Sequence, residues 1–97
     1  MKVWQLLDSP EKWCRGHLAV DRKGQLTDPE SAAARRWCLF GAICRCYTSG
    51  RGKPRDRAYT IALRAEKLLG NFPLGGWNDS LERCWDDVYG VARALDI

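Results

Sequence analysis

One stretch near the middle of the chain restricts the fold more than any other feature. It opens with Asp28-Pro29-Glu30, and these residue types favour the N-cap and the first turn of a helix. The residues that follow, SAAARRWCLFGAICRCY, carry apolar side chains around most of a helical circumference. A helix that is apolar nearly all round lies inside a protein. We therefore predict a buried central helix that starts at Asp28 and ends at about Tyr47.

Three other segments have helical patterns. Residues 3–7 form a short first helix, and Pro10 starts a further helical turn after Ser9. Residues 55–69 form a helix closed by Gly70, with these side chains facing inward: Ala58, Ile61, Ala62, Ala65 and Leu68 or Leu69. The last helix spans about residues 85–95, with these side chains facing inward: Val88, Val91, Ala92 and Leu95. At Gly41 and Ala42 of the central helix, the small side chains should let another helix approach closely.

The remaining segments are predicted to be turns and a hairpin. Residues 17–20 and 25–27 should pair around the turn Asp21-Arg22-Lys23-Gly24. Residues 71–79 should be a turn-rich connection, because they contain Pro73, Gly75 and Gly76. Together these patterns predict a mainly α fold in a single domain over residues 1–97. We expect a compact bundle of about four helices with a buried central helix and a small β-hairpin.

Composition excludes several classes of protein. Five tryptophans in 97 residues can supply a core without covalent staples. No apolar run approaches the length of a membrane span, and the first residues do not resemble a signal peptide. The five cysteines are odd in number and include no C-x-x-C, so neither a disulfide framework nor a zinc site is indicated. We expect a cytoplasmic protein without a cofactor, a metal ion or a membrane partner.

Several short motifs occur in a recognisable order: Trp13-x-x-Gly16, Asp21-x-x-Gly24, Trp37-Cys38-Leu39-Phe40-Gly41-Ala42-Ile43 and Trp77-Asn78-Asp79. This order resembles a family of small uncharacterised proteins of bacteria and their phages, with the pattern W-x-x-G…D-x-x-G…W-C-L-x-G-A-I…W-N-D. The resemblance runs from Trp13 to the last helix and implies a shared fold and a mobile-element origin, but no activity. This chain has Cys84 where the family usually has threonine as an N-cap. Cysteine is a poor cap, so the last helix should start elsewhere or be less stable.

Charge is segregated along the chain. From Arg35 to Lys67 there are nine basic residues against two acids, and from Leu68 to the last residue there are two basic residues against five acids. In the helix predicted over residues 55–69, Arg57, Thr60, Arg64 and Lys67 form a stripe away from the apolar face. A basic loop precedes this helix. The candidate binding residues are Arg51, Lys53, Arg55, Arg57, Arg64 and Lys67.

These features favour a non-enzymatic binding protein that engages an acidic protein surface through the basic stripe and loop. A phage-encoded accessory or host-interaction factor, acting as an inhibitor, would have such a surface. Two alternatives stay open. The same residues could bind nucleic acid, or His17 with Cys14 or Cys84 could serve a small cysteine-dependent enzyme.

The motif Trp77-Asn78-Asp79 has two interpretations. It could form a polar pocket with an aromatic wall. Alternatively, Trp77 fills the core while Asn78 and Asp79 bond backbone groups that open the last helix. The second interpretation is favoured.

Overall fold

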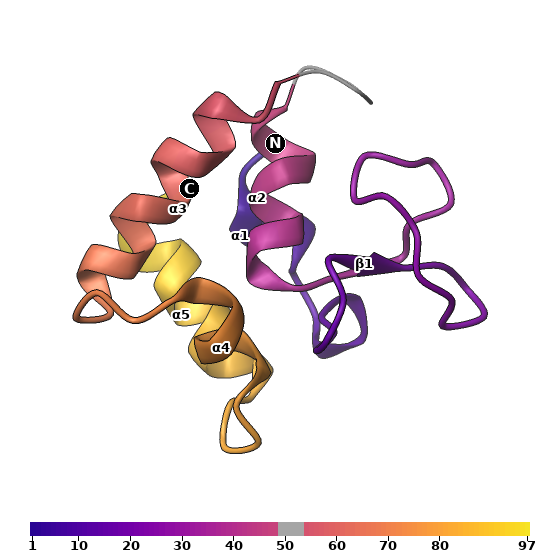
Figure 1. Cartoon of the computed structure of the whole chain (residues 1–97). Helices are drawn as coiled ribbons and strands as arrows, with labels where there is room; N and C mark the ends of the chain where they lie inside the picture. The colour runs from indigo at the N-terminus through magenta and orange to yellow at the C-terminus, as the bar shows by residue number, and fades with distance from the viewer. Residues whose placement is uncertain (49–53) are drawn as a thin grey trace.

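The computed structural model describes residues 1–48 and 54–97. The elements in chain order are α1 (Val3–Leu6), the 3-10 turn η1 (Pro10–Lys12), β1 (Ala19–Val20), β2 (Arg36–Trp37), α2 (Leu39–Tyr47), α3 (Asp56–Leu68), α4 (Leu74–Asp79) and α5 (Trp85–Leu95). In Figure 1, α2 is central, with α3, α4 and α5 on one side and the two short strands with their loops on the other. The mainly helical fold with a small sheet is confirmed. A bundle of about four helices is not, because the described residues form five α-helices.

The central helix α2 is buried, as predicted, but it begins at Leu39 and not at Asp28. Five of its nine residues are buried: Leu39, Gly41, Ala42, Ile43 and Cys44. Its N-cap is Cys38, whose Sγ accepts the amide hydrogen of Gly41 at 3.2 Å. Its start is therefore fixed eleven residues later than the Asp-Pro-Glu signal indicated.

Residues 28–37 form turns and a strand where we predicted the beginning of that helix. The amide of Ser31 donates to the carbonyl oxygen of Asp28 at 3.0 Å, which makes a turn, and an Asp-Pro pair suits a turn as well as a helix start. Arg36 and Trp37 pair with β1 in an antiparallel ladder, Val20 opposite Arg36. This pairing satisfies backbone groups through a segment distant in the sequence, so local helix propensity is overridden.

The predicted hairpin is present in part. Around the turn at 21–24, the amide of Asp21 donates to Gln25 O at 2.9 Å and that of Thr27 donates to Ala19 O at 3.1 Å. Gly24 closes the turn with φ +79°, a value that favours glycine. Val20 and Leu26 form only an isolated bridge, and the strand that completes the sheet with β1 is β2.

A backbone segment, and not another helix, approaches α2 at Gly41. A Cβ atom at this position would lie 1.8 Å from the carbonyl oxygen of Leu18. The loop that leads into β1 therefore rests directly on α2, and only glycine leaves room for it.

The predictions for α3 and α5 are confirmed in their main features. On α3, these residues are buried: Ala58, Ile61, Ala62 and Ala65. Leu68 is exposed and Leu69 is half-buried. The turn after α3 contains Gly70 with φ +76°. On α5, these residues are buried: Val88, Val91 and Ala92, while Leu95 is half-buried.

The helix α5 begins at Trp85, and Cys84 does not shift its start. The carboxylate of Asp87 accepts the amide hydrogen of Cys84 at 3.1 Å. This bond satisfies a backbone group at the helix start. Asp87, in the first turn, therefore partly compensates for the absence of a threonine N-cap.

Helix α4 replaces the turn-rich connection that we predicted. Its first residue, Leu74, donates its amide hydrogen to Oε2 of Glu66 on α3 at 2.9 Å. Leu74 and Trp77 are both buried. Burial of these two side chains and a partner for the first amide outweigh the cost of Gly75 and Gly76 in a helix. None of the helices described, in residues 1–48 or 54–97, has the length and apolar character required to cross a membrane.

Candidate functional site: a groove beside α3

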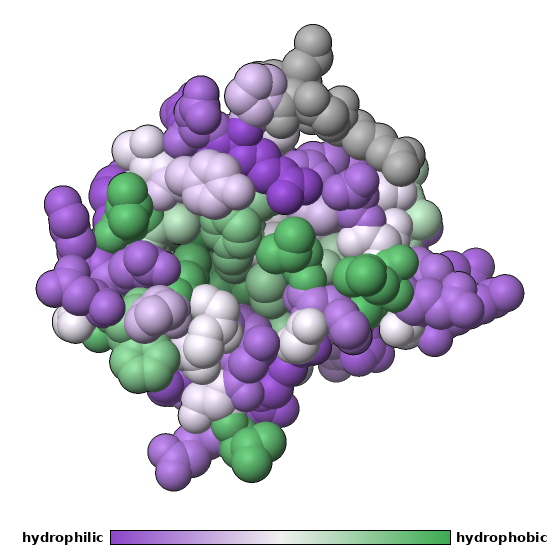
Figure 2. Space-filling view, in the orientation of Figure 1, coloured by the Kyte–Doolittle hydropathy of each residue, from purple (hydrophilic) through white to green (hydrophobic). Residues whose placement is uncertain are grey.

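A groove of about 500 Å³ lies where α2, α3, α4 and the loop at residues 16–18 meet. Its apolar walls are formed by Leu18, Phe40, Tyr59, Ala62, Leu63 and Leu74. Figure 2 shows apolar side chains gathered in a hollow on this face of the molecule. The volume falls in the range of about 300–1,000 Å³ that is usual for small-molecule sites.

One flank of α3 supplies a wall of the groove. Tyr59, Leu63 and Glu66 follow one another at helical spacing, beside the stripe that α3 buries. Tyr59 and Leu63 remain 55% and 57% exposed. The ring of Tyr59 packs against that of Phe40 on α2, with centroids 5.4 Å apart and planes tilted by 33°. These two aromatic side chains and Leu63 form an apolar surface that the fold itself does not cover.

Two carboxylates line the groove, one near each end of α4. Oε2 of Glu66 accepts the amide hydrogen of Leu74, the first residue of α4. Asp79 is the last residue of α4, and its Oδ1 accepts the amide hydrogen of Gly16 and an amide hydrogen of Asn78, both at 2.9 Å. Each carboxylate is thus held in place by hydrogen bonds within the protein.

Asn78 lies behind the groove and is 1% exposed. Its Oδ1 accepts the indole hydrogen of Trp13 at 2.8 Å and the amide hydrogen of Leu39 at 3.0 Å. Its Nδ2 donates to the carbonyl oxygen of Cys14 at 3.2 Å and to Asp79. The favoured interpretation of this motif is confirmed in part, since Trp77 is buried and both polar residues bond backbone groups. Those groups belong to the loop at 14–16 and to the start of α2, and not to the start of the last helix as predicted.

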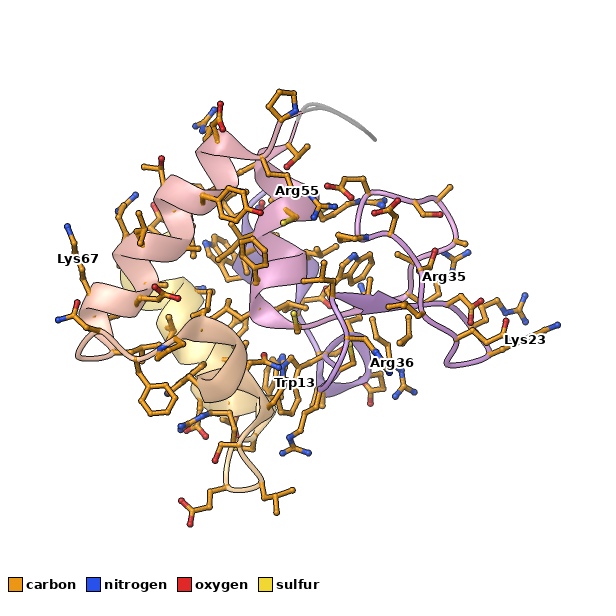
Figure 3. All side chains as sticks on the ribbon, in the orientation of Figure 1. Trp13, Lys23, Arg35, Arg36, Arg55 and Lys67 are labelled. Carbon is orange, nitrogen blue, oxygen red and sulfur yellow. The ribbon has the colours of Figure 1, made fainter. Side chains whose placement is uncertain are left out.

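The predicted basic residues lie in three different situations. Arg57, Arg64 and Lys67 are exposed on α3; we call these three residues the basic stripe. Figure 3 shows Lys67 projecting outward from α3. The guanidinium of Arg57 lies over the ring of Tyr47, 5.3 Å from its centroid. Arg51 and Lys53 lie outside the described residues.

Arg55 is half-buried and paired with acids. Its Nε and Nη2 donate to the two carboxylate oxygens of Glu30, each at 3.1 Å, and Nη2 lies 3.3 Å from Oδ1 of Asp28. The side chain of Glu30 is only 6% exposed. Arg55 therefore links the start of α3 to the loop at 28–31 (Figure 3), and we leave it out of the basic stripe.

Four of the five cysteines have raised pKa values. Burial raises the pKa of Cys14 to about 12 and those of Cys44 and Cys46 to about 11, and it also raises the pKa of Cys38. The Sγ of Cys14 lies 3.6 Å from the carbonyl oxygen of His17, to which it can donate. These four side chains are neutral thiols near pH 7. The form of cysteine that acts as a nucleophile is the thiolate. Among the described residues, no cluster of His, Cys, Asp and Glu could hold a metal ion.

No sequence pattern predicts the groove, because its walls come from segments far apart in the chain. One signal pointed toward it. Tyr59 and Leu63 lie four residues apart on α3 and belong to neither the predicted inner stripe nor the basic stripe, so they place two large apolar side chains next to each other outside the buried face.

The sequence profile of a family described as "Family of unknown function (DUF6197)" matches residues 2–95. The chain belongs to this family, which agrees with the resemblance to an uncharacterised family. No curated protein matches the chain, and no solved structure matches it.

Proposed function

We propose that this member of the family is a non-enzymatic binding protein that engages an acidic surface of a protein partner through the basic stripe. The observation that carries the proposal is the state of Arg57, Arg64 and Lys67. All three are exposed on one regular helix, and within residues 1–48 and 54–97 none of them pairs with a carboxylate. Exposed cations without a carboxylate partner inside the protein are free to attract an acidic surface.

The helix that carries the stripe is anchored on its other side. Ala58 and Ala65 are fully buried, and Ile61 and Ala62 are nearly so. The buried face fixes the rotation of α3, so the backbone positions that carry the three cations stay the same when a partner arrives. Only the side chains have to be ordered on binding, which costs less conformational entropy than ordering the backbone as well.

The proposal includes a cellular setting. We infer that the protein is encoded by a phage and acts in the cytoplasm as an accessory or host-interaction factor. It would inhibit its partner by occupying an acidic face of that partner. The support for this setting is the order of the tryptophan, glycine and W-N-D motifs. The support for a binding role is the basic stripe.

The test compares two triple charge reversals in a pull-down from host lysate treated with nuclease. The stripe variant carries Arg57→Glu, Arg64→Glu and Lys67→Glu. The control variant carries Arg22→Glu, Lys23→Glu and Arg36→Glu, three exposed cations outside α3. We expect the native protein and the control to capture the same partner, which salt releases, and the stripe variant to capture none.

Two results would count against the proposal. Equal capture by all three proteins would show that the stripe is an ordinary solvated face. Capture by the native protein from untreated lysate but not from nuclease-treated lysate, together with binding of short DNA or RNA at low salt, would favour the nucleic-acid alternative.

A further inference from the structure

We infer that the groove is a binding site for a small organic cation, in which an ammonium group is carried on an aromatic or alkyl body. The ammonium group would lie against the carboxylate of Glu66 or that of Asp79, at one end of α4 or the other, and the apolar body against Phe40, Tyr59 and Leu63. This inference goes beyond the proposed function and does not rest on it. Arg57, Arg64 and Lys67, which form the stripe, do not line the groove.

Charge is the first argument. The chain has 16 basic residues and 12 acids. The groove, by contrast, is lined by two carboxylates and the imidazole of His17, and by no lysine or arginine among the described residues. A site with this balance favours cations and disfavours anions. The effect is stronger at the half-buried Glu66, because water screens the charge of the exposed Asp79.

The carboxylates are prepared for a further hydrogen-bond donor. Each already accepts a backbone amide hydrogen through one oxygen, Oε2 in Glu66 and Oδ1 in Asp79. Within the described residues, no hydrogen bond or ion pair uses the second oxygen of either group. A fixed carboxylate with an open oxygen can accept a charge-assisted hydrogen bond from an ammonium group without prior ordering.

The apolar walls of the groove indicate the chemical character of the rest of the ligand. The tilted rings of Phe40 and Tyr59 offer π faces, which attract cations and pack against other rings. Leu18, Leu63 and Leu74 complete the apolar lining. A cavity of about 500 Å³ suits a small molecule with one ring or a short alkyl chain. An ammonium group next to such a body has both of the features that the groove complements.

The experiment uses three ligands that share one apolar body and differ in charge. Phenethylamine is cationic, phenethyl alcohol is neutral and hydrocinnamate is anionic at neutral pH. Each is titrated into the isotopically labelled full chain, and nitrogen–proton NMR spectra are followed. We expect phenethylamine to shift the amide signals of Gly16 and Leu74, whose hydrogens are bound to the two carboxylates. We expect it to bind about tenfold more tightly than the alcohol, as hydrogen bonds to charged groups allow, and hydrocinnamate to bind more weakly than either.

Variants locate the site. Glu66→Gln with Asp79→Asn keeps the shape of both side chains and removes their charge, so phenethylamine should bind about as weakly as the alcohol. The matched control is Glu82→Gln with Asp86→Asn, two exposed acids that do not line the groove, and it should bind as the native chain does.

A second pair of variants guards against loss of folding in the first. Leu63→Lys places a cation beside the groove at a position that is already 57% exposed, whereas Leu81→Lys makes the same change at a 93% exposed position away from it. Leu63→Lys should abolish binding of phenethylamine and Leu81→Lys should not. Equal affinities of the three ligands, shifts outside the groove, or no saturable binding of phenethylamine would overturn the inference.

Discussion

The side chain of Asn78 binds the indole of Trp13, with Oδ1 accepting the Nε1 hydrogen at 2.8 Å across 65 residues of sequence. The same oxygen accepts the amide hydrogen of Leu39, at the start of the central helix. One buried side chain therefore joins the N-terminal loop, α2 and α4. The groove lies in front of this junction, so its shape depends on residues that do not line it.

Asn78→Ala should lower the free energy of unfolding by about 3 kcal/mol, because it leaves the buried amide of Leu39 and the part-buried indole N–H of Trp13 without partners. Trp13→Phe keeps an aromatic ring but removes the pyrrole part of the indole with its donor, while Oδ1 of Asn78 still accepts from Leu39, so it should cost less, roughly 1–2 kcal/mol. Urea denaturation measures both changes. Gln25→Ala, at an exposed turn position, is the control and should be nearly neutral. Equal small effects of all three changes would show that the junction contributes little.

Gly41→Ala should destabilise the protein by about 3 kcal/mol or more, because a Cβ there would meet the backbone of Leu18. Gly90→Ala is the matched control in α5, where nothing lies within 4 Å of an added Cβ. It should stabilise the protein by about 0.5–1 kcal/mol, since alanine is the better helix former. Thermal unfolding by circular dichroism compares the two variants. A stable Gly41→Ala protein would contradict the close contact between this loop and α2.

Arg55→Ala should cost about 2 kcal/mol, because it leaves the nearly buried carboxylate of Glu30 without its bidentate partner. A double-mutant cycle with Glu30→Ala isolates the coupling between the two side chains. Lys12→Ala removes an exposed pair with Asp8 and should cost less than about 0.5 kcal/mol. A coupling energy near zero would indicate that Arg55 is available to a partner after all, and that the basic stripe includes it.

Stability should fall in alkaline solution. The folded-state pKa values are about 12 for Cys14 and about 11 for Cys44 and Cys46, whereas a cysteine in an unfolded chain ionises near pH 8.5. Above about pH 8.5 the unfolded state therefore binds fewer protons than the folded state, and the free energy of unfolding decreases as pH rises. The stabilisation is complete below that pH and is lost as the pH rises toward about 11 to 12.

Urea midpoints measured between about pH 7 and pH 10.5 test this dependence. The variant Cys46→Ala should show a shallower decline than the native chain, because it has one fewer buried thiol to ionise. A flat profile in the native protein would show that the buried thiols do not favour the neutral form.

The elements that the sequence predicted well are those whose signals are local. Helix α3 has an inner stripe of small apolar residues and a glycine after its end, and α5 has acids in its first turn and a clear apolar face. Both therefore begin and end within a residue or so of their predicted bounds. Burial of α2 was also predictable, because apolar residues cover most of its circumference.

The errors have non-local causes. The start of α2 was misplaced because Val20 pairs with Arg36, and no pattern within residues 28–37 announces a partner that lies before them. Helix α4 was missed because its first amide is satisfied by Glu66, a side chain from α3. The groove was missed for the same reason, since residues such as Leu18 and Leu63 meet only in the folded chain.

The two ends of the chain contact each other. Nζ of Lys2 donates to the carbonyl oxygen of Asp96 at 2.8 Å. The amide of Trp4 donates to the carbonyl oxygen of Ile97 at 3.3 Å. The first and last residues of this sequence are thus neighbours in the fold. A short linker could join residues 1 and 97, and new ends could be opened at an exposed turn such as 21–24 without separating packed elements. A circularly permuted chain should reach the same structure, which would mean that the order in which its segments are synthesised is not required for folding.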